Sequence, residues 1–210
     1  MTAESWLQEM WERVRFSALE VPDDVSVIDL AGCTFLWVAL IFLGFSYVAM
    51  PIMRSQVSPS FVHFLLARID LVFHEAGHIL FLPFGRFLSV LGGSLLQILI
   101  PLICTYTFLL RHQNAFGASV TLWWTGQSFI ELAPYVADAS SQGLLLLGGV
   151  TGQDAPGAHD WNNLLTWTGL LRYDRTLGMA THVLGAGLIV FALLWGSYLL
   201  WNQYEVVRDA

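Results

Sequence analysis

The sequence predicts an all-α protein built as a polytopic bundle of transmembrane helices, and three observations lead to this fold class. Hydrophobic residues make up 56% of the 210 residues and charged residues only 12%, whereas soluble domains carry about 25% charged residues. Several runs reach the ~20 apolar residues that a helix needs to cross a bilayer. The 9 Trp and 14 Phe are typical of membrane interfaces. Lipid is therefore the expected solvent for most of the chain.

Residues 1–26 are expected to form an amphipathic helix that lies in the membrane interface. Apolar residues recur at helical spacing from Trp6 to Ala18, and the acidic side chains lie largely off that face. A helix packed against the end of the bundle is the alternative. Pro22 ends the pattern, because proline disfavours helix at the residue before it.

Residues 27–210 are expected to form a single bundle with about five spans. The first span is uncharged, whereas the second is interrupted by ionisable residues. A long loop, 139–175, separates the fourth span from the fifth and contains an expected interfacial helix at 161–171 with Asp160 as its N-cap. The expected spans are 29–53, 61–83, 87–110, 115–138 and 176–202.

The distribution of charge bears on topology and on partners. With five spans, more arginines fall on the N-terminal side of the membrane, which favours a cytoplasmic N-terminus. The chain is therefore expected to be a multi-pass integral membrane protein, with the bacterial inner membrane as the expected location. A net charge of −7 without a basic patch argues against a nucleic-acid partner. The sequence leaves the oligomeric state open.

The second expected span carries the motif His74-Glu75-Ala76-Gly77-His78. Two histidines four residues apart lie on one helix face, one turn apart, so that one metal ion can reach both rings. Glu75 is rotated by about 100° from the first histidine and can reach a water beside the metal, which is the arrangement of zinc hydrolase helices. Gly77 would let another segment approach closely. A purely structural polar cluster is the alternative, but ionisable groups in a span cost about 2.5 kcal/mol or more each.

A catalytic zinc takes three protein ligands and leaves one position for water. The second and fourth spans run in the same direction, so Asp138, at the end of the fourth, is expected at a membrane depth similar to that of the histidines. Asp138 is therefore the preferred third ligand. Glu131, deeper in the fourth span, and His159 and Asp160, in the loop, are alternative ligands.

Asp70 shares a helix face with His74 and could accept a proton from the outer nitrogen of that ring. An ion pair between Asp70 and Arg68 is the alternative. Glu131 could also pair with an arginine or carry protons.

The helix Phe73–Leu80 resembles the active-site helix of the site-2 protease family, the intramembrane zinc metalloproteases. That family places HExxH in one transmembrane helix and a metal-binding Asp near the end of a later one. The segment Glu131–Ala139 is similar to the family's second motif, with Pro134 and Asp138 in comparable places, although the family's Asn and Gly are replaced. The resemblance covers roughly residues 61–140.

This resemblance implies an intramembrane zinc metalloprotease that binds one zinc ion per chain and hydrolyses a peptide bond in a membrane-embedded segment of another protein. It implies the two motif histidines and Asp138 as ligands and Glu75 as the catalytic base. Gly92-Gly93 with Gln97 would correspond to the family's glycine-containing stretch. Two alternatives stay open: a non-catalytic metal-binding membrane protein of the same ancestry, acting as a structural or regulatory partner, and a metal-dependent hydrolase of a lipid or small amide.

Overall fold

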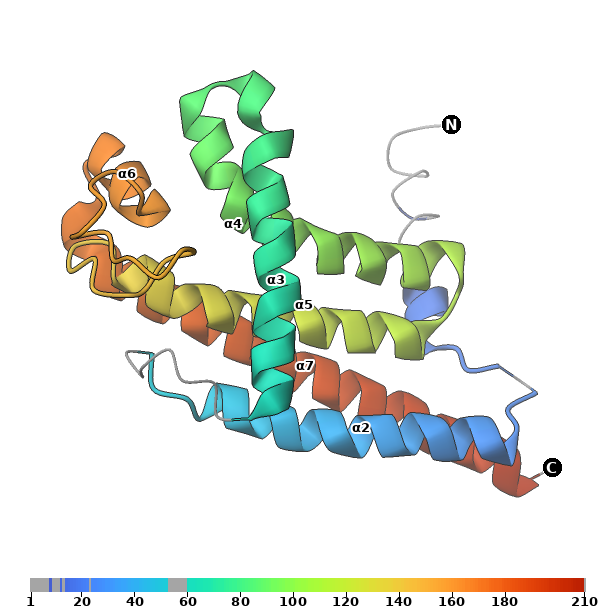
Figure 1. The fold of residues 1–210 in the computed structure, drawn as a ribbon. Helices are drawn as coiled ribbons and strands as arrows, with labels where there is room; N and C mark the ends of the chain where they lie inside the picture. Colours follow the sequence, from blue (N-terminus) through green and yellow to red (C-terminus); the bar gives the residue numbers. More distant parts are fainter. Residues whose placement is uncertain (1–7, 9–11, 13, 23, 53–59, 210) are drawn as a thin grey trace. The chain divides into compact units, whose positions relative to one another are not determined.

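A computed structural model describes the chain at residues 8, 12, 14–22, 24–52 and 60–209. No β-strand occurs among these residues, in which Leu145 and Thr151 form an isolated bridge. The all-α fold class is therefore confirmed. The helices in chain order (Figure 1) are α2 (Val27–Val48), α3 (Phe61–Leu80), η1 (Leu82–Phe84), α4 (Arg86–Tyr106), η2 (Thr107–Arg111), α5 (Ala115–Ala137), α6 (Asp160–Trp167), η3 (Leu171–Tyr173) and α7 (Asp174–Asp209).

Three helical stretches in the described part of the chain are long and apolar enough to cross a membrane, namely Val27–Val48, Arg86–Arg111 and Leu171–Asp209. They match the first, third and fifth expected spans. The second and fourth expected spans also form helices, α3 and α5, but these two are not among the three. Multiple apolar helices are thus confirmed, whereas five spans, a cytoplasmic N-terminus and an inner-membrane location stay predictions.

Most of the expected N-terminal helix lies outside the described residues. Its last part, residues 14–19, is helical. The indole N–H of Trp195, on α7, donates a hydrogen bond to the carbonyl oxygen of Ala18 at 2.8 Å. The end of this helix therefore contacts α7, as expected for a helix packed against the bundle.

The chain divides into two compact units, and the core of the first surrounds Trp37. This side chain is 2% exposed, and its ring centroid lies 5.4 Å from that of Phe116. Its indole N–H donates to the Ser197 hydroxyl at 3.0 Å. Gly196 provides the room, because a Cβ at this position would collide with the Trp37 ring. The first unit contains Met1–Ser46, Pro101–Thr125 and Leu188–Ala210.

The second unit holds all the residues of the predicted site, and it includes a tight helical hairpin. Helix α3 and the first part of α4 run antiparallel on either side of η1 (Figure 1). A Cβ on Gly77 would collide with the carbonyl oxygen of Gly92, so glycine at both positions permits this close approach. Small residues are typical of helix contacts within membranes. The expectation that Gly77 allows close approach is confirmed. The second unit contains Tyr47–Ile100 and Gly126–Gly187.

Helix α6 lies beside the first part of α4 within the second unit (Figure 1). The indole N–H of Trp161 donates to the Ser94 hydroxyl at 3.1 Å, and the ring of Trp167 lies 6.2 Å from that of Phe87. The predicted loop between the fourth and fifth spans therefore folds back along α4, because its aromatic residues find apolar and hydroxyl partners there.

The N-cap of α6 differs from the prediction by one residue. His159 caps the helix, and its Nδ1 accepts a hydrogen bond from the backbone N–H of Asn162 at 3.1 Å. The prediction that Asp160 is the N-cap is therefore wrong, because the imidazole of the preceding residue satisfies the free amide. As a result, the carboxylate of Asp160 is available for other contacts.

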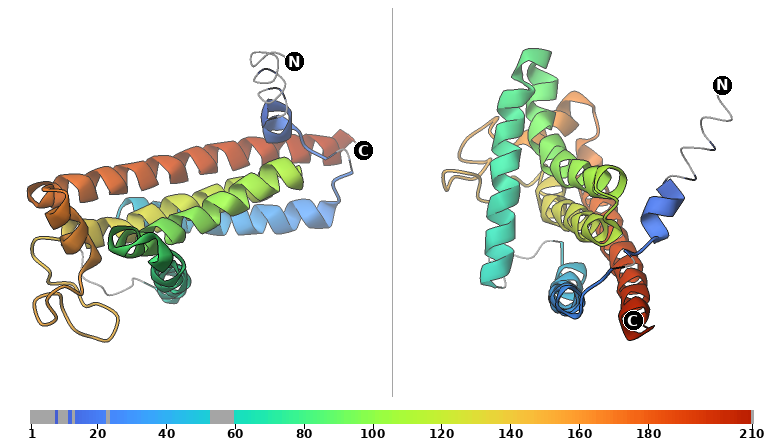
Figure 2. Two further views of the ribbon diagram at one scale, coloured as in Figure 1. Left: turned by 90° about the horizontal axis from the view of Figure 1, so that it is seen from above. Right: turned by 90° about the vertical axis from the view of Figure 1, so that its right-hand side faces the viewer.

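The contact between the second half of α5 and the start of α7 (Figure 2) gives a matched test of packing. A Cβ on Gly185 would lie 2.5 Å from the Gly126 carbonyl oxygen and 2.8 Å from Ile130 Cγ1, whereas Gly187 has nothing within 4 Å. We expect Gly185→Ala to lower the free energy of unfolding by about 1–3 kcal/mol through overpacking. Gly187→Ala should stabilise the helix by up to about 1 kcal/mol.

Thermal unfolding of the detergent-purified variants, followed by far-ultraviolet circular dichroism, measures this difference. Equal midpoints for the two alanine variants would contradict the close packing of α5 on α7.

Candidate metal centre

Helix α3 presents the two motif histidines on one face. It begins after Ser60, whose hydroxyl accepts a hydrogen bond from the backbone N–H of His63 at 3.4 Å. His74 is 7% exposed, and its ring centroid lies 4.9 Å from that of His78, with the two planes at 76°. Glu75 follows on the neighbouring face and is half-buried. The expected placement of two imidazoles one helical turn apart is confirmed.

Asp160, the first residue of α6, completes the group. Its Oδ2 lies 3.1 Å from His74 Nε2 and 3.2 Å from His78 Nε2. Among the residues that the structure describes, this group could hold a metal ion, since its ligand atoms all lie within 4.8 Å of one another. Burial opposes ionisation of Asp160, but its hydrogen bonds and charge interactions with the two histidines outweigh burial and lower its pKa to about 2. Asp160 is therefore a carboxylate at neutral pH, as a metal ligand must be.

The outer nitrogens of both histidines are held by oxygen atoms of α4. His78 Nδ1 donates to the backbone carbonyl oxygen of Ser89 at 2.9 Å, and His74 Nδ1 donates to Gln97 Oε1 at 3.1 Å. The amide orientation of Gln97 follows from its own nitrogen, which donates to the Ser128 carbonyl oxygen at 3.4 Å. Each ring thus carries a proton on Nδ1, and its Nε2 faces the centre. Metal-binding histidines commonly have such partners on their outer nitrogens.

The charges at the centre fit a cation. With the outer nitrogens protonated, either a proton on each Nε2 or a cation in its place must face the Asp160 carboxylate, because three hydrogen-bond acceptors would otherwise converge in a largely buried space. Such a cluster requires added protons or a cation among its members. Two ligands about 2.0–2.1 Å from a tetrahedral zinc lie about 3.3 Å apart, close to the 3.1 and 3.2 Å that separate Asp160 Oδ2 from the two nitrogens.

Gly93, on α4, lies directly against the two motif histidines. A Cβ on this residue would lie 2.6 Å from His78 Nε2 and 2.7 Å from His74 Nε2. Any side chain at this position would therefore collide with both Nε2 atoms. The residues present and their charges fit a bound metal ion, and glycine at position 93 keeps side-chain atoms away from their Nε2 atoms.

Asp138, the preferred third ligand from sequence, is engaged in the loop that follows α5. Its carboxylate accepts hydrogen bonds from the Ser141 hydroxyl at 2.6 Å and from two backbone N–H groups of the loop at 3.1 and 2.9 Å. His159 is fully buried, with Nε2 3.5 Å from Asp138 Oδ2. The structure therefore brings Asp160, and neither Asp138 nor His159, to the two motif histidines. Loop amides need a buried acceptor, and Asp138 provides it.

Asp70 does not hold the outer nitrogen of His74, because Gln97 takes that position. Asp70 is 1% exposed and accepts a hydrogen bond from the Ser128 hydroxyl at 3.3 Å. Arg68, its alternative partner, is exposed, and its guanidinium lies 4.9 Å from the centroid of a neighbouring phenylalanine ring. Asp70 shares a face with His74 as expected, but that histidine turns its outer nitrogen toward α4.

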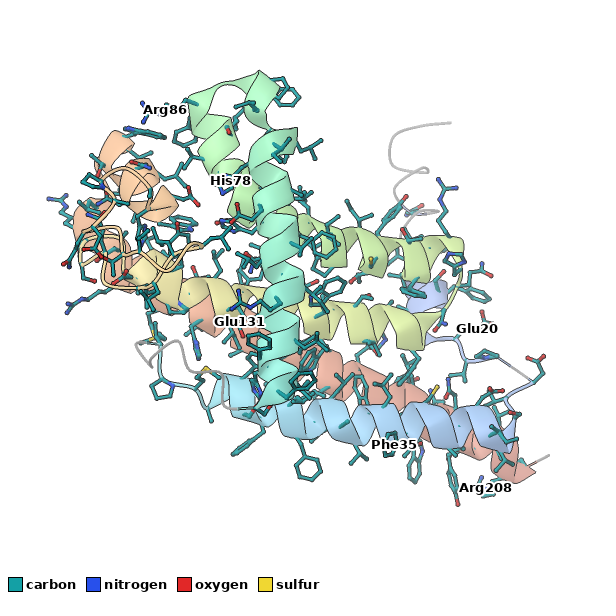
Figure 3. All side chains as sticks on the ribbon, viewed as in Figure 1. Glu20, Phe35, His78, Arg86, Glu131 and Arg208 are labelled. Atoms are coloured by element: carbon teal, nitrogen blue, oxygen red, sulfur yellow. The ribbon has the colours of Figure 1, made fainter. Side chains whose placement is uncertain are left out.

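Glu131 belongs to a separate polar cluster on α5. Its carboxylate forms hydrogen bonds with Tyr47 and Gln127, which are both fully buried. Figure 3 shows Glu131 and His78 at different levels along α3. Glu131 is therefore not among the residues that the structure brings together at the candidate metal centre.

Tyr135 is a member of the site that the sequence analysis did not single out. Its hydroxyl donates to Asp160 Oδ2 at 3.2 Å and accepts a hydrogen bond from the Asp160 backbone N–H at 2.9 Å. No local pattern distinguishes this tyrosine from the others, because its partner is 25 residues away in the sequence. Ser89 was also missed, since it contributes only a backbone carbonyl. Gln97 was noted only through the resemblance.

No family model, no curated protein and no solved structure matches the chain. The interpretation of the site therefore rests on its geometry.

The close approach of Gly93 to the two motif histidines can be tested directly. We expect Gly93→Ala to abolish stoichiometric metal binding, because the added methyl group would push both imidazoles away from the centre. Gly32→Ala is the control, since a Cβ there has nothing within 4 Å. Metal content is measured by inductively coupled plasma mass spectrometry on protein purified in detergent. Full metal content in Gly93→Ala would show that the ion does not lie between the two Nε2 atoms.

The choice between the two aspartates is tested by matched alanine substitutions. We expect Asp160→Ala to weaken metal binding by more than the roughly 10–100-fold that loss of a ligand's hydrogen-bond partner costs. Asp138→Ala should retain the metal but expose the loop before α6 to proteolysis, because the loop amides lose their acceptor. Chelator competition and limited proteolysis measure the two effects. Loss of zinc in Asp138→Ala with retention in Asp160→Ala would reverse the assignment.

Proposed function

We propose that this protein is an intramembrane zinc-dependent endopeptidase of the site-2 protease type. The observation that carries the proposal is the convergence of His74 Nε2, His78 Nε2 and Asp160 Oδ2 within 4.8 Å. The helix that bears the two histidines, α3, also bears Glu75. Three protein ligands with one position left open are typical of catalytic zinc, whereas structural sites have four. The resemblance of this helix to the family's active-site helix gives the reaction class.

The donor set favours zinc among the common metals. Two imidazole nitrogens and one carboxylate oxygen are the ligands of several zinc hydrolases, whereas magnesium and calcium prefer oxygen ligands alone. When bound, zinc supplies Lewis acidity, which brings the pKa of a coordinated water near neutral and polarises a carbonyl group.

Glu75 is the proposed general base. It follows His74 directly on α3 and is half-buried, so its carboxylate has access to water while it stays beside the centre. A carboxylate in this place accepts a proton from the attacking water and delivers it to the leaving amine of the cleaved peptide. The histidines and Asp160 hold fixed positions during this transfer, because their hydrogen bonds reach into α4 and α5.

The proposed substrate is a membrane-embedded segment of another protein. The outward face of α3 is apolar although its inward face carries the motif, which suits a helix in contact with lipid on one side. Its exposed apolar side chains are Phe61, Val62, Phe64, Leu65, Ile69, Val72, Ile79 and Leu80. We infer that α3 crosses the membrane together with the three most apolar helices, and that the substrate reaches the centre from the bilayer.

Metal content provides the first test of the proposal. We expect the protein purified in detergent to contain about one zinc per chain, as three convergent ligands require, and the His74→Ala/His78→Ala double variant to contain none. His112→Ala is the control, because that histidine is exposed and follows the end of η2, outside the motif helix. Absence of zinc from the wild-type protein, also after incubation with zinc, would refute the proposal.

Activity provides the second test. We expect zinc-loaded protein in proteoliposomes to cleave members of a panel of single-span reporter proteins, and Glu75→Gln to keep zinc but lose cleavage. General acid–base catalysis typically contributes a factor of about 10²–10⁴, so the residual rate should fall by at least that range. Zinc binding without cleavage of any reporter by the wild-type protein would instead support the non-catalytic alternative.

A further inference from the structure

The hydroxyl of Tyr135 joins the end of α5 to the first residue of α6. It accepts a hydrogen bond from the Asp160 backbone N–H at 2.9 Å and donates to Asp160 Oδ2 at 3.2 Å. This carboxylate oxygen is the same atom that approaches both motif histidines. One phenol group thus fixes the backbone and the side chain of Asp160 at once.

We propose that Tyr135 is a positioning residue that presents the Asp160 carboxylate to the metal centre. The inference rests on the metal centre proposed above and adds the residue that sets the geometry of its third ligand. An aspartate side chain has several rotamers, and fixing it in one of them costs conformational entropy. A hydrogen bond that already holds the side chain in that rotamer removes this cost from the free energy of metal binding. The phenol O–H, aimed at Oδ2, selects the rotamer in which that oxygen faces the two Nε2 atoms.

Asp160 needs such support because of its place in the chain. It begins a helix of only 8 residues, at the end of a long irregular loop. The first backbone N–H groups of a helix have no hydrogen-bond acceptor within that helix. The Tyr135 hydroxyl accepts the hydrogen bond from the backbone N–H of Asp160. The motif histidines, by contrast, lie inside a 20-residue helix and are held by α4. Asp160 is therefore the proposed ligand whose position depends most on a contact from outside its own helix.

The ring of Tyr135 has a separate packing role that survives removal of the hydroxyl. Its centroid lies 4.4 Å from that of His159, the N-cap of α6, and 6.1 Å from that of His74. Phenylalanine retains both contacts. Tyr135→Phe thus removes the two hydrogen bonds to Asp160 while the surrounding structure keeps its packing.

The test is a double-mutant cycle on zinc affinity, measured in the full-length protein by competition with a chromophoric chelator. We expect Tyr135→Phe to weaken zinc binding by about 10–100-fold, as for other groups that hold a metal ligand in place. In the Asp160→Ala background the same substitution should have no further effect, because Tyr135 acts through that carboxylate. Cobalt-substituted protein should show a changed visible spectrum in Tyr135→Phe. Tyr173→Phe is the matched control, since Tyr173 is partly exposed beside Arg172.

The outcomes separate this inference from the proposed function. Wild-type protein that binds zinc with an affinity equal to that of Tyr135→Phe overturns the positioning role and leaves the metal centre intact. An equal loss of affinity in the wild-type and Asp160→Ala backgrounds also overturns it, because the effect would then be structural. Wild-type protein that binds no zinc overturns both.

Discussion

Two imidazole nitrogens and one carboxylate oxygen meet in a largely buried space, and this meeting requires positive charge among them. The requirement arises because the Ser89 carbonyl and Gln97 Oε1 fix a proton on each outer nitrogen. Each inner nitrogen then faces the carboxylate oxygen either through a proton of its own or through a shared cation. In a medium of low dielectric constant such a group is costly unless a cation neutralises it. The other features of the second unit can be understood as the means of holding these three atoms together.

Helix contacts on glycine provide the first of these means. Gly77 and Gly92 bring α3 against α4, and Gly93 has no Cβ that would collide with the two rings. The same approach lets the Ser89 carbonyl reach His78 across the hairpin. Larger residues at these positions would separate the helices and fill the centre. The small residues therefore serve both the packing of the hairpin and the proposed binding of the ion.

The loop between α5 and α6 provides the second means. Asp138 accepts hydrogen bonds from the loop amides, His159 caps α6, and Tyr135 joins α5 to Asp160. These three residues make different hydrogen bonds, and together they hold the Asp160 carboxylate in position. A loop fixed at several points can supply a ligand in a defined position, because each contact removes conformational freedom before the ion binds.

The sequence by itself determined the all-α class, the apolar helices and the pair of histidines one turn apart. Each of these depends on a local property, either hydropathy over ~20 residues or the 3.6-residue period of a helix. The third member of the site, the partners of the outer nitrogens and the role of Tyr135 were decided only by the tertiary structure. Asp138 and Asp160 are both acidic residues near helix ends, and no local pattern tells which of them faces the histidines. The difference arises because His159 caps α6, whereas the loop amides donate hydrogen bonds to Asp138. The approach of Asp160 to the histidines forms only when distant segments come together.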